Sequence, residues 1–167
     1  MEIEFSQEVS RMDELKIQAM VLIPVLRAAR AELGEEHGNR LVLDALRVFR
    51  REYFQQLGDS LPGSPLEKWN AINSRAMGRV RADQLESVRL RKDAEAFDLD
   101  VRRCKFAEFF REQGEPDLGA ALVCECDQQL ADIVGSPELE LTRTQTLMQG
   151  GCCCDFRFRM NSSSPQE

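Results

Sequence analysis

Six cysteines are the residues best suited to chemistry in this chain of 167 residues. They are Cys104, Cys124, Cys126, Cys152, Cys153 and Cys154. Three interpretations compete: small buried hydrophobic residues, which suits Cys126 and Cys152, zinc ligands, or nucleophiles, which need a nearby base or cation to lower the thiol pKa. A Cys-x-Cys pair and a run of three cysteines do not match the usual spacing of zinc knuckles, so we expect neither a metal nor a cofactor.

Asp127 is the second candidate, because it shares a predicted helix face with Cys124. Its other neighbours on that face, Ala120 and Ala131, are small and apolar. Asp127 is therefore either an ordinary surface aspartate or a carboxylate that faces a pocket. If it is buried without a cation, its pKa rises and it becomes a possible general base.

Residues 142–159 predict a β-hairpin that positions further candidates, because apolar and polar residues alternate on both sides of Gly150-Gly151, a two-residue turn signal. Alternation assigns one face of the second arm to the core. That face holds Cys152, Cys154, Phe156, Phe158 and Met160. The face pointing away from the core holds Cys153, Asp155, Arg157 and Arg159, and Asp155 is interpreted as structural, pairing with the neighbouring arginines.

The first arm carries two polar residues on its predicted inner face, Arg143 and Gln145. The apolar residues expected beside them are Leu139, Leu141 and Leu147, while Thr142, Thr144 and Thr146 face water. A buried charge without a partner costs several kcal/mol. Arg143 and Gln145 therefore either satisfy each other or a nearby carboxylate, or they bind a small polar ligand. A guanidinium beside Cys154 would favour its thiolate.

Hydrophobic periodicity and chain breakers predict the remaining elements. Helices are expected at residues 7–33, 39–57, 66–94, 104–112 and 116–134, and a strand at 97–103. The first helix should start at Ser6 or Ser10, kink or split at Pro24 and stop at Gly34. The second has an expected wet face of Arg40, Arg47, Arg50, Arg51 and Glu52.

This order of elements predicts an α+β fold, in which an N-terminal helical bundle packs on a small antiparallel sheet of three or more strands. We expect a single domain over residues 1–160, with a helical layer at 1–95 and a strand–helix–helix–hairpin layer at 96–160. Residues 161–167 are expected to be a disordered tail.

Charge and composition limit the partners. A net charge of −7 disfavours nucleic acid, and no apolar run is long enough to span a bilayer. Without an export signal, we expect a cytoplasmic protein with reduced thiols. The single histidine, His37, lies in a predicted interhelix turn facing solvent, which excludes mechanisms that need two histidines. The polar helix at 66–94 is either solvated or contacts a second subunit in a homo-oligomer.

Four separated motifs resemble the L-2-amino-thiazoline-4-carboxylic acid hydrolase family. They are CKFAEFFREQGEP at 104–116, CECD at 124–127, RTQTLMQG at 143–150 and CDFRF at 154–158. The similarity covers roughly residues 96–159, whereas the N-terminal helices match only in their helical pattern and a Leu-Gly-Glu-Glu turn. The matched positions are Cys104, Cys124, Asp127, Gly150, Cys154, Asp155 and Phe156, and they leave out Cys152 and Cys153.

The resemblance implies hydrolytic opening of a thiazoline ring to give N-carbamoyl-L-cysteine. We expect a hydrolase acting on a small cyclic amidine or amide with a carboxylate. Its candidate catalytic residues are Cys154, Asp127, Cys124 and Cys104, and its candidate substrate-binding residues are Arg143 and Gln145. Either a base activates water or Cys154 attacks the substrate itself. The alternative is a non-enzymatic sensor or regulatory module that binds a small molecule in the same pocket.

Overall fold

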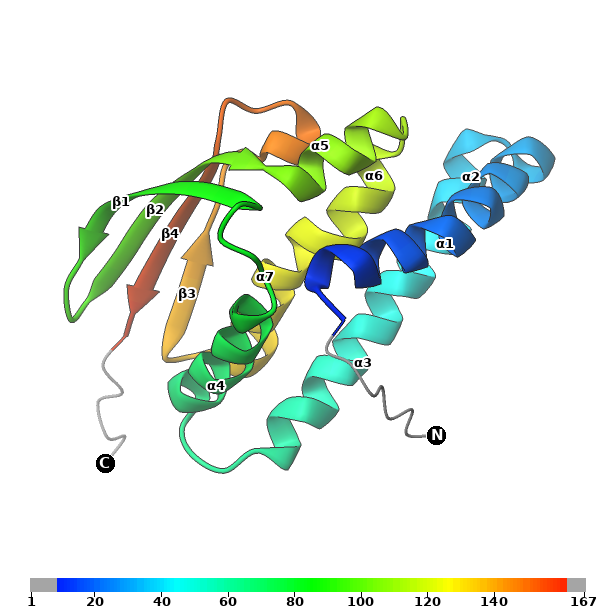
Figure 1. Ribbon diagram of the computed structural model, residues 1–167. Helices are drawn as coiled ribbons and strands as arrows, with labels where there is room; N and C mark the ends of the chain where they lie inside the picture. The colour runs from blue at the N-terminus through cyan, green and yellow to red at the C-terminus, as the bar shows by residue number, and fades with distance from the viewer. Residues whose placement is uncertain (1–8, 162–167) are drawn as a thin grey trace.

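A four-stranded antiparallel sheet with helices packed on one face is the framework of the protein (Figure 1). In this computed structural model, which describes residues 9–161, the strands are β1 (Leu85–Lys92), β2 (Ala96–Cys104), β3 (Leu139–Thr142) and β4 (Cys154–Met160), in the order β1-β2-β4-β3. The predicted α+β class is confirmed. The tail predicted to be disordered lies, apart from Asn161, outside the described residues.

Helix α1 (Arg11–Leu33) begins at the cap predicted from the sequence, where the Ser10 side chain accepts a hydrogen bond from a backbone N–H of the first turn. It ends at Gly34, whose φ of 80° favours a residue without a Cβ. The helix continues through Pro24, so the predicted split is wrong.

The second helical segment is longer than predicted. Helix α2 (Glu35–Asn39), the π-helical turn η1 (Arg40–Asp44) and α3 (Ala45–Ser60) follow one another without a break. The predicted interhelix turn is therefore already helical. His37 is exposed as expected, but it lies on a helix and not in a loop.

The predicted helix at 66–94 is wrong beyond its first half. Helix α4 (Pro65–Gly78) starts with a capping box between Ser64 and Glu67, but strand β1 replaces the second half. Strand β1 is an edge strand that pairs only with β2, and all its residues after the first are exposed. An edge strand with no buried face carries no alternating pattern, so nothing in its composition distinguished it from a solvated helix.

The elements after β1 agree with the sequence. Strand β2 carries the predicted core residues, and helix α5 (Lys105–Glu112) follows it. Residues 116–135 then form one long helix, which we call the central helix. It consists of α6 (Pro116–Gly119), the π-helical turn η2 (Ala120–Cys124), α7 (Glu125–Leu130) and a second π-helical turn, η3 (Ala131–Gly135).

The hairpin exists, but its turn differs from the prediction. Strands β3 and β4 pair from Leu139 opposite Met160 to Thr142 opposite Arg157, and residues 143–153 connect them through the 3₁₀ helix η4 (Leu147–Gln149). A two-residue turn at Gly150-Gly151 is therefore wrong. Strand alternation fails within the connection for the same reason. Thr146 and Cys153 are buried although predicted outward, and Cys152 is exposed although predicted inward.

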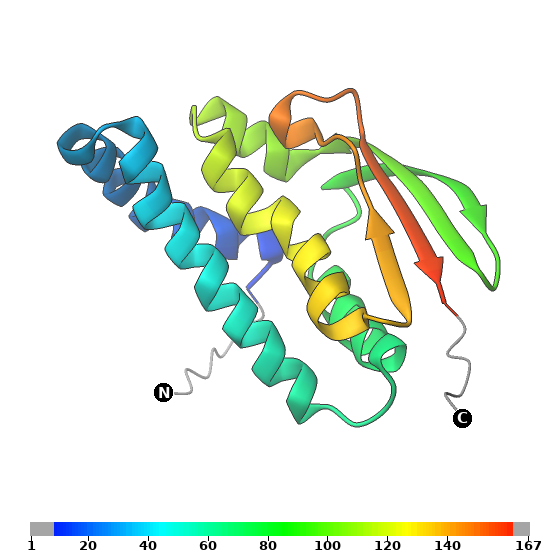
Figure 2. The ribbon, with the colours of Figure 1, turned by 180° about the vertical axis from the view of Figure 1, so that it is seen from behind.

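The central helix lies between the sheet and helix α3 (Figure 2). On one side, sheet residues such as Phe158 pack with Ala131 and with Trp69 of α4. On the other, Phe54 of α3 packs with Leu130. Side chains of the central helix can therefore meet the sheet or α3. Within residues 9–161, no helix combines the length and apolar character needed to cross a bilayer.

Candidate functional site

Five of the six predicted site residues come together between the central helix and the sheet. Cys104 ends β2, Cys124 and Asp127 belong to the central helix, Arg143 follows β3, and Cys154 begins β4. Each of the three thiols and the carboxyl is close enough for its pKa to be affected by other members of the set. We call these five residues the Asp127 cluster.

Gln145, the sixth, organises the connection between β3 and β4. Its Oε1 accepts a hydrogen bond of 3.1 Å from the backbone N–H of Cys152 and lies 3.4 Å from that residue's Sγ. Its side-chain oxygen is thus engaged with the protein chain.

Arg143 points inward, as strand alternation predicted, and its side chain is only 9% exposed. Nη1 donates to Asp127 Oδ2 at 3.3 Å, and Nη2 donates to the carbonyl oxygen of Cys124 at 2.6 Å. The guanidinium carbon also lies 4.9 Å from the centre of the Phe156 ring, where a cation–π contact is favourable. Of the two interpretations, pairing with a nearby carboxylate is the one that the contacts support.

Asp127 combines two properties that rarely occur together. Its side chain is 42% exposed, yet the surrounding protein removes enough hydration to raise the pKa of the carboxyl to about 6, even though the charge and hydrogen bond of Arg143 act to lower it. Solvent therefore reaches the Asp127 side chain although protein surrounds most of it. A carboxyl with a pKa near neutrality can take up and release a proton under ordinary conditions.

The thiols behave differently from the expectation. Burial raises the pKa of Cys104, Cys124 and Cys154, and for Cys154 it outweighs the opposing charge of Arg143 and a hydrogen bond of 3.3 Å from the backbone N–H of Leu147. Arg143 therefore acts on Cys154 in the predicted direction, but burial is the larger effect and the net pKa of the thiol is raised. All six cysteines are free thiols. At neutral pH, Asp127 is the member of the cluster poised to exchange protons.

Asp155 faces away from the cluster and anchors the chain that carries Arg143. Its carboxylate accepts hydrogen bonds from the backbone N–H groups of Thr144 and Gln145, at 3.0 and 2.8 Å, and from the Thr144 hydroxyl at 2.6 Å. Burial opposes ionisation, but these bonds hold the pKa of Asp155 below its ordinary value. The structural interpretation agrees with these contacts.

The expected partners of Asp155 were wrong, because other carboxylates of the outer sheet face are nearer to the arginines. Arg157 pairs with Asp100 at 2.9 Å, and Arg159 pairs with Asp98. Asp155 is consequently available to hold the connection between β3 and β4.

Two buried charged residues were missed in the sequence. Glu115, 3% exposed, accepts bonds from Arg27 at 2.8 Å and Arg30 at 2.6 Å. Arg50 was expected on a wet helix face, yet it is only 9% exposed. A signal for Arg50 was present, since it lies four residues from both Leu46 and Phe54 in the apolar stripe of α3.

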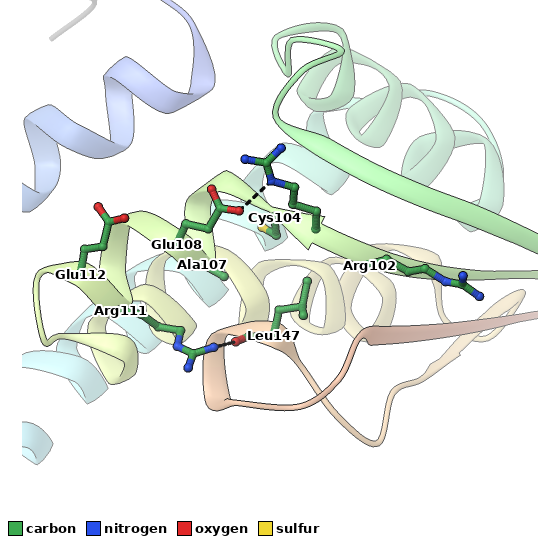
Figure 3. A pocket seen from close by; sticks show the side chains of 8 residues that line it. Arg102, Cys104, Ala107, Glu108, Arg111, Glu112 and Leu147 are labelled. Atoms are coloured by element: carbon green, nitrogen blue, oxygen red, sulfur yellow. Dashed lines mark hydrogen bonds and ion pairs between the residues drawn. The ribbon is translucent and has the colours of Figure 1, made fainter.

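A surface hollow of about 300 Å³ adjoins the cluster (Figure 3). It lies between the end of β2, helix α5 and η4, and Cys104 lines it beside the ion pair of Arg103 and Glu108 at 2.8 Å. Arg111 closes one side by donating to the carbonyl oxygen of Leu147 at 3.3 Å. Cys104 is thus shared by the hollow and the Asp127 cluster.

In the described part of the chain, no group of three or more histidine, cysteine or acidic residues has the arrangement of a metal site. The family model for L-2-amino-thiazoline-4-carboxylic acid hydrolase matches residues 14–158, which include the N-terminal helices as well as the whole Asp127 cluster. No curated protein matches the chain.

Proposed function

Because the chain belongs to the L-2-amino-thiazoline-4-carboxylic acid hydrolase family, we propose that it hydrolyses a small cyclic amidine or amide that carries a carboxylate. The substrate we favour is 2-aminothiazoline-4-carboxylate, with N-carbamoyl-cysteine as product. The observation that carries this proposal is the state of Asp127, a solvent-reachable carboxyl whose pKa of about 6 suits a general base.

In the proposed reaction, water attacks the ring carbon that lies between sulfur and nitrogen. The Asp127 carboxylate accepts a proton from this water as the C–O bond forms. The C–S bond then breaks as the carbonyl of the carbamoyl group forms. The remaining hydroxyl proton of the attacking water goes to the ring nitrogen, and Asp127 gives its proton to the leaving sulfur, which becomes a thiol. One water molecule is consumed, and Asp127 returns to its starting carboxylate.

The other cluster residues support this role. Arg143 holds Asp127 in place through its 3.3 Å contact, so we propose that it positions the base. Cys104, Cys124 and Cys154 carry pKa values raised by burial, which favours neutral lining groups over nucleophilic thiolates. Gln145 is proposed to order the connection that carries Arg143.

The test is turnover of 2-aminothiazoline-4-carboxylate, with product identified by mass spectrometry. Asp127→Asn should lower kcat by about 10²–10⁴-fold, the usual contribution of a general base. Asp132→Asn is the matched control, since Asp132 is an exposed carboxylate five residues further along the central helix. Equal rates for Asp127→Asn and wild type would remove Asp127 from the mechanism. A wild-type protein that binds but does not convert thiazolines or cyclic ureides would favour a binding module.

A further inference from the structure

Arg50 is a buried cation that has no hydrogen-bond or ion-pair partner among the residues that the structure describes. The residue is 9% exposed, and its Nη1 atom has no hydrogen-bond partner and almost no contact with solvent. Across residues 9–161, the structure records no hydrogen bond or ion pair for this side chain. An uncompensated buried charge is strongly destabilising, so a guanidinium in this position calls for an anion.

Two contacts fix where Arg50 lies along the central helix, which runs beside α3 (Figure 2). One turn before it, Arg47 pairs with Glu125 at 2.7 Å. One turn after it, Phe54 packs against Leu130. Arg50 is therefore level with residues 126–129. In agreement, its positive charge acts to lower the pKa of both Cys126 and Asp127.

Arg143 is less suited to receive a substrate carboxylate than the sequence suggested. Both ends of its guanidinium fork bind the protein, one to Asp127 and the other to the carbonyl oxygen of Cys124. Arg50 has the same fork with Nη1 still free, and such a fork can bind a carboxylate through two parallel hydrogen bonds.

We propose that Arg50 binds the carboxylate of the substrate and thereby selects anionic rings, while Asp127 acts on the ring carbon. This inference rests on the proposed function. A second atom adds to the argument, because the buried Oε1 of Gln129 also has no hydrogen-bond partner among the described residues, and Gln129 belongs to the stretch level with Arg50. An acceptor and a cation that both lack partners, at the same level along the two helices, match a ligand that offers both an N–H group and a carboxylate.

Calorimetric binding of two stable aromatic analogues tests the proposal. One is 2-aminothiazole-4-carboxylate, and the other is 2-aminothiazole, which lacks the carboxylate. Wild type should prefer the carboxylate analogue by about 100-fold, and Arg50→Met should lose this preference while its affinity for 2-aminothiazole stays unchanged. Arg51→Met is the matched control, because Arg51 is the next residue on α3 and is exposed.

A second variant covers the case in which Arg50→Met does not fold. Arg50→Lys keeps the charge but not the planar fork, and it should retain only part of the preference. The proposal is overturned if wild type binds both analogues equally, as it would if water satisfied Arg50, or if Arg50→Met or Arg50→Lys keeps the full preference. Neither analogue can be opened by hydrolysis, so the binding experiment does not depend on catalysis. If the protein prefers the carboxylate analogue but does not turn over 2-aminothiazoline-4-carboxylate, the proposed hydrolase activity is contradicted and the Arg50 site is not.

Discussion

Two carboxylates that pair with arginine at the central helix, Glu115 and Asp127, have opposite surroundings. Glu115, just before the helix, is 3% exposed and receives two arginine bonds of 2.8 and 2.6 Å. Asp127, in the middle of the helix, keeps 42% of its side-chain exposure and has one arginine contact of 3.3 Å. The first carboxylate is enclosed and fully engaged, and the second is left partly open.

This difference distinguishes a carboxylate with a structural role, Glu115, from one suited to proton transfer, Asp127. Glu115 joins α1 to the start of the central helix through Arg27 and Arg30, and solvent barely reaches it. Asp127 has lost hydration without full compensation from Arg143, which is why its pKa rises to about 6. A reactive carboxyl must be both reachable by solvent and incompletely compensated, and of these two carboxyls Asp127 meets both conditions.

The largest effect on stability should come from the enclosed carboxylate. Glu115→Ala leaves Arg27 and Arg30 without their common partner, and we expect the free energy of unfolding to fall by about 3 kcal/mol. Urea unfolding measures this change. Glu112→Ala, an exposed carboxylate on α5, should change it by less than about 0.5 kcal/mol. Equal stabilities for the two variants would contradict a structural role for Glu115.

Removal of the arginine that pairs with Asp127 tests the comparison further. Arg143 lowers the pKa of Asp127, so Arg143→Met should raise it further and move the acidic limb of the pH–rate profile to higher pH. At pH 7 we expect kcat/KM to fall by about tenfold for each unit of that move above neutrality. A rise in KM with the limb unmoved would instead return Arg143 to the substrate-binding role expected from the sequence.

The smallest effect on catalysis is expected for Cys154, the thiol that the sequence analysis named first among the candidate catalytic residues. Cys154→Ala should cost about 1–2 kcal/mol of stability, as small cavity-forming changes do, and leave kcat within about tenfold of wild type. Cys153→Ala is the control, since Cys153 is also buried. A loss of about 10³-fold or more in folded Cys154→Ala alone would make this thiol the nucleophile, and the contrast between the two carboxylates would no longer explain catalysis.

Local patterns in the sequence predicted the elements around the Asp127 cluster. Strict alternation marked β2 and the two hairpin arms, and helical spacing placed Cys124 and Asp127 on one face. The connection at 143–153 could not be predicted from its glycines, because side chains determine its path. Thr146 caps η4 by accepting from Gln149, and Asp155 fixes the backbone of Thr144.

The features that the sequence did not predict depend on contacts between residues far apart in the chain. Arg27 and Glu115 are 88 residues apart, so no local window shows that they meet. Arg50 followed the apolar stripe of α3, but its charge suggested solvent, and only packing against the central helix reveals its burial. Edge strand β1 has no buried face, so its sequence lacks the alternation of apolar and polar residues that would have predicted a strand.

The pH dependence of kcat/KM tests the central claim, that Asp127 is a general base whose pKa is raised because Arg143 only partly offsets its loss of hydration. Below its pKa the carboxyl is protonated and cannot accept a proton, so the rate should fall about tenfold per pH unit below about 6 and level off above it. The same limb should disappear in Asp127→Asn, with a low residual rate. A wild-type rate that is flat from pH 5 to pH 8, or a limb near pH 6 that survives in Asp127→Asn, would contradict the account.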